Sequence, residues 1–340
     1  MTITAPRPAG ARAPALPPAR GELSAAVSGR LRGRPGALPG PRAAAAADPY
    51  GEDVQLALHL CYELHYRGFD GVPDAAEWDP DLLRLRALLE ERFEGALREA
   101  CPGPATPDEV FDALLTEPPD GRGVSRHLLR HGTLEQLREY AVLRSVHQLR
   151  ESDPQAWMLP RLRGRAKAGL VTVLYDEFGC GREERAHARL YADLMSALGL
   201  DPGYGRYLPE VGAPALAVAN VMSLFGLHRA RRGALVGHFA ALEIGSPPAA
   251  SWHAAALRRC GAGEAAVRYY DEHVEADAVH EQLVRREVVG GLLAEEPGLA
   301  PDVAFGARAT VLLDDALATS AIRAWRSGAG ALRPTSEEEA

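Results

Sequence analysis

The chain has 340 residues, of which 46% are hydrophobic and 25% charged, and its formal net charge is −8. This composition fits one large or two small globular domains with an ample core. The body of the chain has no basic cluster, which argues against a nucleic-acid partner. The longest nearly apolar run, residues 213–227, is too short to span a membrane.

The usage of lysine, arginine and cysteine indicates the kind of organism and the cellular compartment. Lys167 is the one lysine among 38 basic residues, and Ala, Gly and Pro are abundant, which is typical of a GC-rich bacterial genome. The cysteines are widely spaced and never form Cys-x-x-Cys, so they suggest neither a zinc site nor a disulfide framework. We therefore expect a bacterial cytoplasmic protein. The cysteines are Cys61, Cys101, Cys180 and Cys260.

The chain begins with a segment of biased composition. Residues 1–46 consist mainly of Ala, Pro, Gly and Arg, with Glu22 as their one acid, and contain no apolar stretch of secretory type. This composition predicts a disordered arm over residues 1–46. A transit peptide is the alternative, which the bacterial composition disfavours.

From Asp53 onward, apolar residues recur at helical spacing. No alternating strand pattern and no internal repeat is found. The sequence predicts an all-α domain over residues 47–328, a bundle of about eight to ten helices, and a flexible tail over residues 329–340. Its main helices are expected at residues 53–66, 80–99, 133–150, 161–178, 182–198, 214–225, 229–244, 252–259, 264–293 and 304–325.

The segment 269–282 carries the strongest chemical signal. It contains no Gly or Pro, and its helical period places His273, Asp277 and His280 on one face, on successive turns. Burying two imidazoles and a carboxylate is costly unless a partner such as a divalent metal satisfies them. Imidazole and carboxylate without thiolate suit iron, manganese or zinc. The alternative is a solvated charged face.

Further ligands are sought among acids and histidines on otherwise apolar helices. Glu177 ends one predicted helix and His187 lies in the next, and the break at residues 179–181 lets the chain bend so that they approach each other. Glu151 is a weaker candidate, because it stands at the end of its own helix. Each of the three also fits an ordinary role at a helix end or surface. The other histidines considered are His59, His65, His147, His228, His238 and His253.

Several segments together resemble a known family. The segments that carry the resemblance are Glu151-Ser-Asp-Pro, residues 160–168, Asp176-Glu-Phe-Gly-Cys-Gly, residues 223–229, residues 61–69 and the row His273-x3-Asp277-x2-His280. On these segments the sequence is similar to bacterial "iron-containing redox enzyme" proteins of the haem-oxygenase-like di-iron oxygenase and oxidase superfamily, over roughly residues 50–328.

The resemblance implies a haem-oxygenase-like bundle with a di-iron site. It implies two Fe(II) ions per chain and dioxygen as co-substrate for N-oxygenation, desaturation or C–C cleavage of a small amine or acid. An external electron donor and a homodimer are compatible with it, whereas nucleic acid and membrane are not expected partners. Carried over residue by residue, the implied metal ligands are Glu151, Glu177, His187, His273, Asp277 and His280.

Two other functions remain open at this stage. A haem-binding or haem-degrading protein of the same fold would need one axial histidine, and a binding module without metal would keep only the bundle. Neither needs His273, Asp277 and His280 together. The substrate does not follow from the sequence, and Cys180 stands where the family has a glycine.

Overall fold

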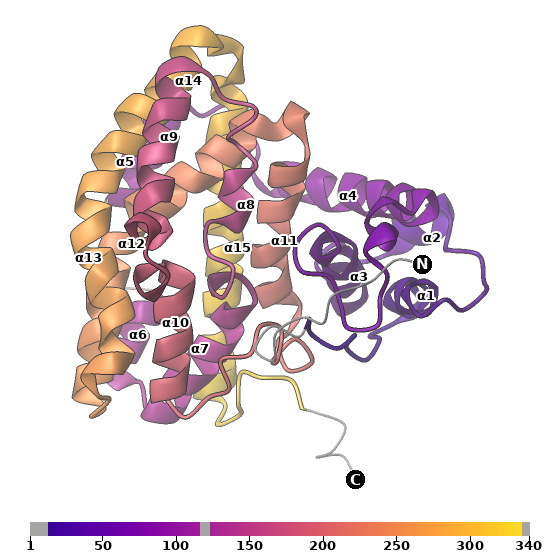
Figure 1. Ribbon diagram of the computed structural model, residues 1–340, viewed down its shortest axis with the longest axis horizontal. Coiled ribbons are helices and arrows are strands. Elements are labelled where there is room, and N and C mark those ends of the chain that lie inside the picture. Colours follow the sequence, from indigo (N-terminus) through magenta and orange to yellow (C-terminus); the bar gives the residue numbers. More distant parts are fainter. Residues whose placement is uncertain (1–12, 116–122, 335–340) are drawn as a thin grey trace.

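The computed structural model describes residues 13–115 and 123–334, except for the side chains of residues 275–279. Every regular element within these ranges is a helix, which confirms the all-α prediction. Figure 1 shows a bundle of long helices with a smaller lobe beside it. None of the described helices is long and apolar enough to cross a membrane.

The lobe holds the first four helices, and the bundle holds the rest. The lobe consists of α1 (Glu22–Leu31), α2 (Pro41–Ala46), α3 (Glu52–Glu63) and α4 (Pro80–Ala100). The bundle consists of α5 (Pro107–Leu115), α6 (Val124–His131), α7 (Leu134–Gln148), α8 (Asp153–Ala156), α9 (Gly164–Glu177), α10 (His187–Ala197), α11 (Ala213–Leu227), α12 (Arg232–Arg259), α13 (Glu264–Leu283), the π-helical turn η5 (Val284–Val289), α14 (Gly290–Glu295) and α15 (Ala300–Arg326).

Helix α12 is the centre of the bundle and packs against α15, α13 and α6. Two glycines let α12 and α15 touch through their backbones. A Cβ atom on Gly237 would lie 1.8 Å from the Val303 carbonyl oxygen, and one on Gly306 would lie 1.9 Å from the Ala234 carbonyl oxygen. Any larger residue at either position would push the two helices apart.

Helix α12 also corrects a sequence prediction. We expected two helices, 229–244 and 252–259, but α12 continues between them through Pro247 and Pro248 without a break. Proline has no N–H, so the carbonyl groups of residues 243 and 244 lose their usual helical donors. Packing against α13 and α15 offsets this local cost.

The predicted disorder of residues 1–46 is wrong for residues 13–46. Pro14 accepts a hydrogen bond from the backbone N–H of Asp70, and Arg20 bonds Glu52 at 2.8 Å. Leu23, Val27 and Leu31 of α1 are buried against α3. The carboxylate of Asp53 accepts hydrogen bonds from the backbone N–H groups of Leu23 and Ser24, at 2.9 and 2.7 Å, and so caps α1 from another helix. Residues 1–12 lie outside the described ranges.

The tail is partly ordered as well. The backbone N–H of Ala331 donates to Glu139 at 3.0 Å, and that of Arg333 donates to the Glu210 carbonyl at 2.7 Å. The expected flexibility of residues 329–340 is therefore corrected for 329–334, and residues 335–340 lie outside the described ranges.

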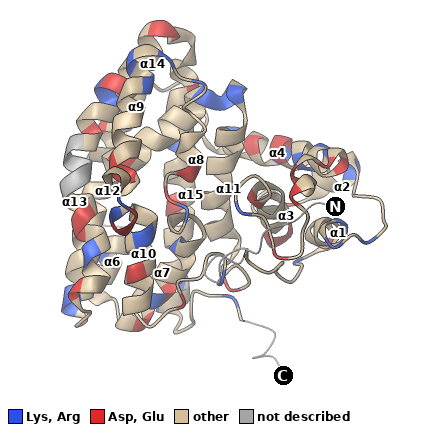
Figure 2. Cartoon of the chain, in the orientation of Figure 1, with Lys and Arg blue, Asp and Glu red and all other residues tan. Residues whose placement is uncertain are grey.

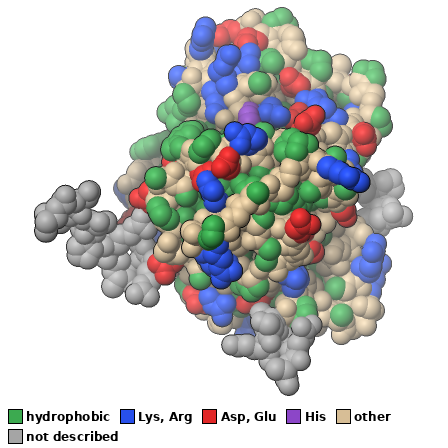
Figure 3. All heavy atoms as spheres, turned by 90° about the vertical axis from the view of Figure 1, so that its right-hand side faces the viewer, with side chains coloured by type: hydrophobic (Ala, Val, Ile, Leu, Met, Phe, Trp, Pro, Cys, Tyr) green, Lys and Arg blue, Asp and Glu red, His purple; other side chains and the backbone are tan. Residues whose placement is uncertain are grey.

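Charged side chains are distributed without separation of sign. Figure 2 shows acidic and basic positions interspersed along the helices. Figure 3 shows the same mixture on the face formed by the lobe. On these views the charge is spread as on an ordinary solvated surface.

Candidate metal centre

The first of two clusters of metal-ligating side chains joins three elements far apart in sequence. Glu151 lies in the turn after α7, His187 is the first residue of α10, and His273 lies on α13. One donor atom from each lies within 4.8 Å of the others. The His273 Nε2 and Glu151 Oε1 atoms are 3.5 Å apart, and the two imidazole ring centres are 4.3 Å apart. We call these three residues the first cluster.

Tyr269 orients two members of the first cluster. Its phenol donates to both carboxylate oxygens of Glu151, at 3.1 and 3.0 Å. Burial, and then Glu151, raise the pKa of Tyr269 well above its ordinary value, so the phenol keeps its proton. The Tyr269 carbonyl lies 2.7 Å from His273 Nδ1 and accepts its proton, which leaves Nε2 to face Glu151. Such outer bonds fix the tautomer and direction of metal-binding groups.

The second cluster consists of Glu177, Glu243 and His280, whose donor atoms also lie within 4.8 Å of one another. Glu177 is the last residue of α9, Glu243 lies in the middle of α12, and His280 is on α13. His280 Nδ1 is 3.2 Å from Glu243 and 3.9 Å from Glu177, while its Nε2 is 3.2 Å from Asp176. All three members are buried.

Glu177 connects the two clusters. Its Oε2 atom lies 3.1 Å from His187 Nδ1 in the first cluster, and its Oε1 faces His280 in the second. The hydroxyl of Ser152 donates to Oε2 at 2.9 Å and holds the carboxylate between them. A carboxylate with one oxygen toward each of two sites is suited to bridging two metal ions.

The buried charges of this centre depend on one another. Burial by itself raises the pKa of Glu177, but His187, His273 and Ser152 lower it to about 2. Burial by itself lowers the pKa of His280, but Glu243, Asp176 and Glu177 raise it to about 9. Carboxylates and imidazoles therefore satisfy each other in pairs.

The pair His187 and Glu177 is spaced as two ligands of one metal ion are. His187 Nδ1 is 3.1 Å from Glu177 Oε2, yet the pair does not meet the angular requirements of a hydrogen bond. Ligand atoms bound about 2.1 Å from one ion at right angles lie about 3 Å apart. The spacing is thus that of two neighbouring ligands, and oxygen with nitrogen donors suits iron, manganese or zinc.

A buried ion pair supports the turn that carries Glu151. Arg150, the preceding residue, is completely buried and bonds Glu63 of α3 at 3.1 Å, and Tyr204 donates to the same carboxylate at 2.7 Å. Ser152 has a positive φ of 69°, which is strained for a residue other than glycine. The lobe thus holds the strained turn that positions Glu151 and Ser152.

The break between α9 and α10 bends the chain, as the sequence predicts. Gly179 has a φ of +70°, and a Cβ there would lie 2.5 Å from the Ala186 nitrogen. Short turns at residues 179–181 and 183–185 carry the chain from Glu177 to His187. This bend brings the two side chains into contact although straight helix would separate them.

Sequence reasoning singled out five of the six residues in these clusters and missed Glu243. The sequence feature that could have identified Glu243 is its position as the one acidic residue in the apolar stretch 239–244 of α12. The side chain of Asp277 lies outside the described residues, so its role as a ligand stays a prediction.

Glu184 is another acid that was not singled out. It stands three residues before His187, the Glu-x-x-His spacing of di-metal sites in helical bundles. In this structure Glu184 is exposed on the turn η3 (Glu183–Arg185) and belongs to neither cluster.

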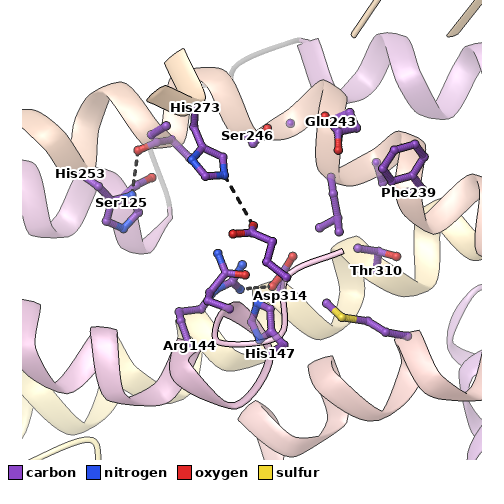
Figure 4. A pocket seen from close by; sticks show the side chains of 18 of the residues that line it. Ser125, Arg144, His147, Phe239, Glu243, Ser246, His253, His273, Thr310 and Asp314 are labelled. Carbon is purple, nitrogen blue, oxygen red and sulfur yellow. Dashed lines mark hydrogen bonds and ion pairs between the residues drawn. The ribbon is translucent and has the colours of Figure 1, made fainter. Parts of the chain in front are cut away.

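A cavity of about 360 Å³ adjoins the metal centre. Glu151 and His273 of the first cluster and Glu177 and Glu243 of the second all line it. Figure 4 shows His273 and Glu243 directed toward the space that also receives side chains from α7 and α15. This volume suits a small organic molecule.

Comparison with known proteins identifies the family of the chain. The model of the family "Iron-containing redox enzyme" matches residues 138–315, just over half of the chain. The chain therefore belongs to this family, and its all-α fold is haem-oxygenase-like. The protein is an iron-dependent oxidoreductase. The match includes both clusters. The chain matches no curated protein.

Proposed function

We propose that this protein is a non-haem di-iron oxygenase or oxidase that uses dioxygen to oxidise a small organic substrate. The observation that carries the proposal is the pair of buried clusters joined by Glu177 beside a cavity. Three carboxylates and three imidazoles suffice for two ions, and the carboxylates would offset most of their charge.

Two ferrous ions, when bound, would supply electrons and open coordination positions for dioxygen. Glu151, His187 and His273 would hold one ion, and Glu243 and His280 the other, with Glu177 shared between them. Tyr269 and Ser152 orient the carboxylates, and the cavity holds substrate away from bulk water. Asp277 is expected to join the ligand set. N-oxygenation, desaturation and C–C cleavage are the reactions considered.

Anaerobic titration with ferrous iron tests the proposal. We expect saturation near two irons per chain, followed by a change in the absorption spectrum when air is admitted. The variant His131→Ala, at an exposed histidine of α6, should behave like the parent protein. Saturation at one iron, unchanged in His273→Ala, would remove the di-iron model.

The alternative of a haem protein is tested in the same experiment. Adding haem to the metal-free protein should give no spectrum of histidine-ligated haem, because the histidines of both clusters already face carboxylates. A stoichiometric haem complex that excludes ferrous iron would favour the haem function instead.

A further inference from the structure

The cavity has a polar wall that the metal centre does not use. Arg144 of α7 and Asp314 of α15 face each other there, with 2.6 Å between Nη1 and Oδ1. In Figure 4 they lie across the view from Phe239 and Glu243, so this wall is separate from the second cluster.

Arg144 has hydrogen-bonding capacity to spare. Among the described residues its Nη1 donates to Asp314, and its Nε and Nη2 donate to none. A guanidinium carries five N–H donors in a planar fork and is always charged in proteins. A fork on a cavity wall with free donors is suited to a ligand carboxylate.

Two acidic side chains lie beside the single positive charge of Arg144. Asp314 is partly exposed and bonds Arg144 through one oxygen, and Asp315, the next residue, is exposed and also lines the cavity. Asp315 therefore lies at the cavity mouth. One guanidinium against two carboxylates leaves a surplus negative charge, which favours a cationic group on the ligand.

A buried histidine adds to this wall. His147 lies one turn after Arg144, lines the cavity and is 5% exposed, and its Nδ1 has no hydrogen-bond partner among the described residues. Burial, and then Arg144 and Arg150, lower the pKa of His147 well below its ordinary value, so the ring is neutral. An unpaired buried imidazole is costly unless a ligand bonds it.

We propose that this wall binds the head group of an α-amino acid, with the ligand carboxylate at Arg144 and the ligand ammonium at Asp314 and Asp315. Arg144 and Asp314 place opposite charges side by side, as the head group of an amino acid does. The ligand carboxylate can therefore pair with Arg144 while the ligand ammonium pairs with Asp314. The remainder of the ligand extends past the apolar side chains of Phe239 and Leu242 toward the metal centre. The inference rests on the proposed function, because an enzyme that oxidises a small molecule must bind it in this cavity.

Binding is measured without turnover, in the metal-free full chain and in the anaerobic ferrous protein. The probes are the common L-amino acids, followed in saturation-transfer NMR. Each one that binds is compared with its decarboxylated amine and its deaminated acid. We expect both analogues to bind roughly ten- to hundredfold more weakly, since each loses a charged hydrogen-bonding group.

Variants assign the two halves of the head group. Arg144→Gln should remove the preference for the amino acid over its amine, and Asp314→Asn should remove the preference over its acid. Arg189→Gln, at an exposed ion pair on α10, is the matched control and should leave both preferences intact. If Arg144→Gln lowers the melting temperature too far, Asp314→Asn alone still tests the inference, because Asp314 is partly exposed.

Every outcome of these binding experiments either supports or overturns the inference. Binding of amino acids with both preferences, each lost in its own variant, supports the inference. Equal binding of simple acids or simple amines, absence of binding by every amino acid, or preferences that survive in both variants overturns it. Iron titration is measured separately. If the protein binds two irons but no amino acid, this inference alone is refuted. If it binds amino acids but no iron, the proposed function alone is refuted.

Discussion

The two clusters differ in what holds them together in the absence of metal. In the first, Tyr269 directs both partners: its phenol donates to Glu151, and its carbonyl accepts from His273 Nδ1. In the second, His280 stands among Glu243, Glu177 and Asp176, and attraction between a proton-bearing ring and carboxylates maintains the geometry. Tyr269 therefore preorganises two members of the first cluster for a metal, whereas the second cluster must exchange the His280 proton for it. Burial by itself lowers the pKa of His187 in the first cluster, but Glu177 raises it above its ordinary value.

Glu177→Gln should have the largest effect, because this carboxylate reaches both clusters. Loss of its charge should weaken ferrous binding at both sites, on the order of a hundredfold or more. Anaerobic titration measures it, with Glu91→Gln at an exposed position of α4 as control. An effect on one iron only would mean that Glu177 does not bridge.

The clusters can be broken one at a time. His273→Ala should remove one iron and His280→Ala the other, because each histidine belongs to a different cluster. The double variant should bind none. Iron content after desalting, together with titration, measures the stoichiometry. Loss of both irons in either single variant would show that the clusters load only together.

The pH dependence of iron binding should be clearest at the second cluster. The pKa of His280 is raised above the unfolded value to about 9, so its proton stabilises the metal-free fold below about pH 6.5, and this contribution is lost as pH rises through 9. Metal needs the deprotonated ring, so affinity at the second cluster should rise by up to about tenfold per pH unit between these values. Titrations of His273→Ala at several pH values test this. Affinity independent of pH would contradict it.

Tyr269→Phe should act on the first cluster alone. The ring stays in place while Glu151 loses its phenolic donor, and removal of such an outer bond costs roughly tenfold in metal affinity. The second iron should bind as before. Tyr175→Phe, at an exposed tyrosine of α9, is the control. Equal weakening of both irons would mean that Tyr269 acts through the whole bundle.

Glu184→Gln should have the smallest effect and tests whether the first cluster gains a carboxylate. If metal extends α10 backward by one turn, Glu184 would come onto the face of His187. We then expect ferrous affinity at the first cluster to fall several-fold, with no change in Glu183→Gln. Equal results for the two variants would mean that η3 keeps its conformation when metal binds.

Local patterns determined the class of fold and most of the chemistry. Helical spacing of apolar residues predicts an all-α chain because side chains three and four positions apart share a face. The same spacing placed His273 and His280 together on α13, and the glycines at 179 and 181 predicted the bend between Glu177 and His187. These are properties of neighbouring residues, which a sequence displays directly.

Only the tertiary structure decided which groups meet. The sequence grouped His273 with His280, whereas packing assigns them to different clusters, with Glu151 and with Glu243. Glu243 reaches the second cluster from α12, a helix that continues through two prolines although proline disfavours a helix interior. The docking of α1 depends likewise on Asp53, thirty residues away. Contacts between distant segments are set by the packing of whole helices, and no local pattern records them.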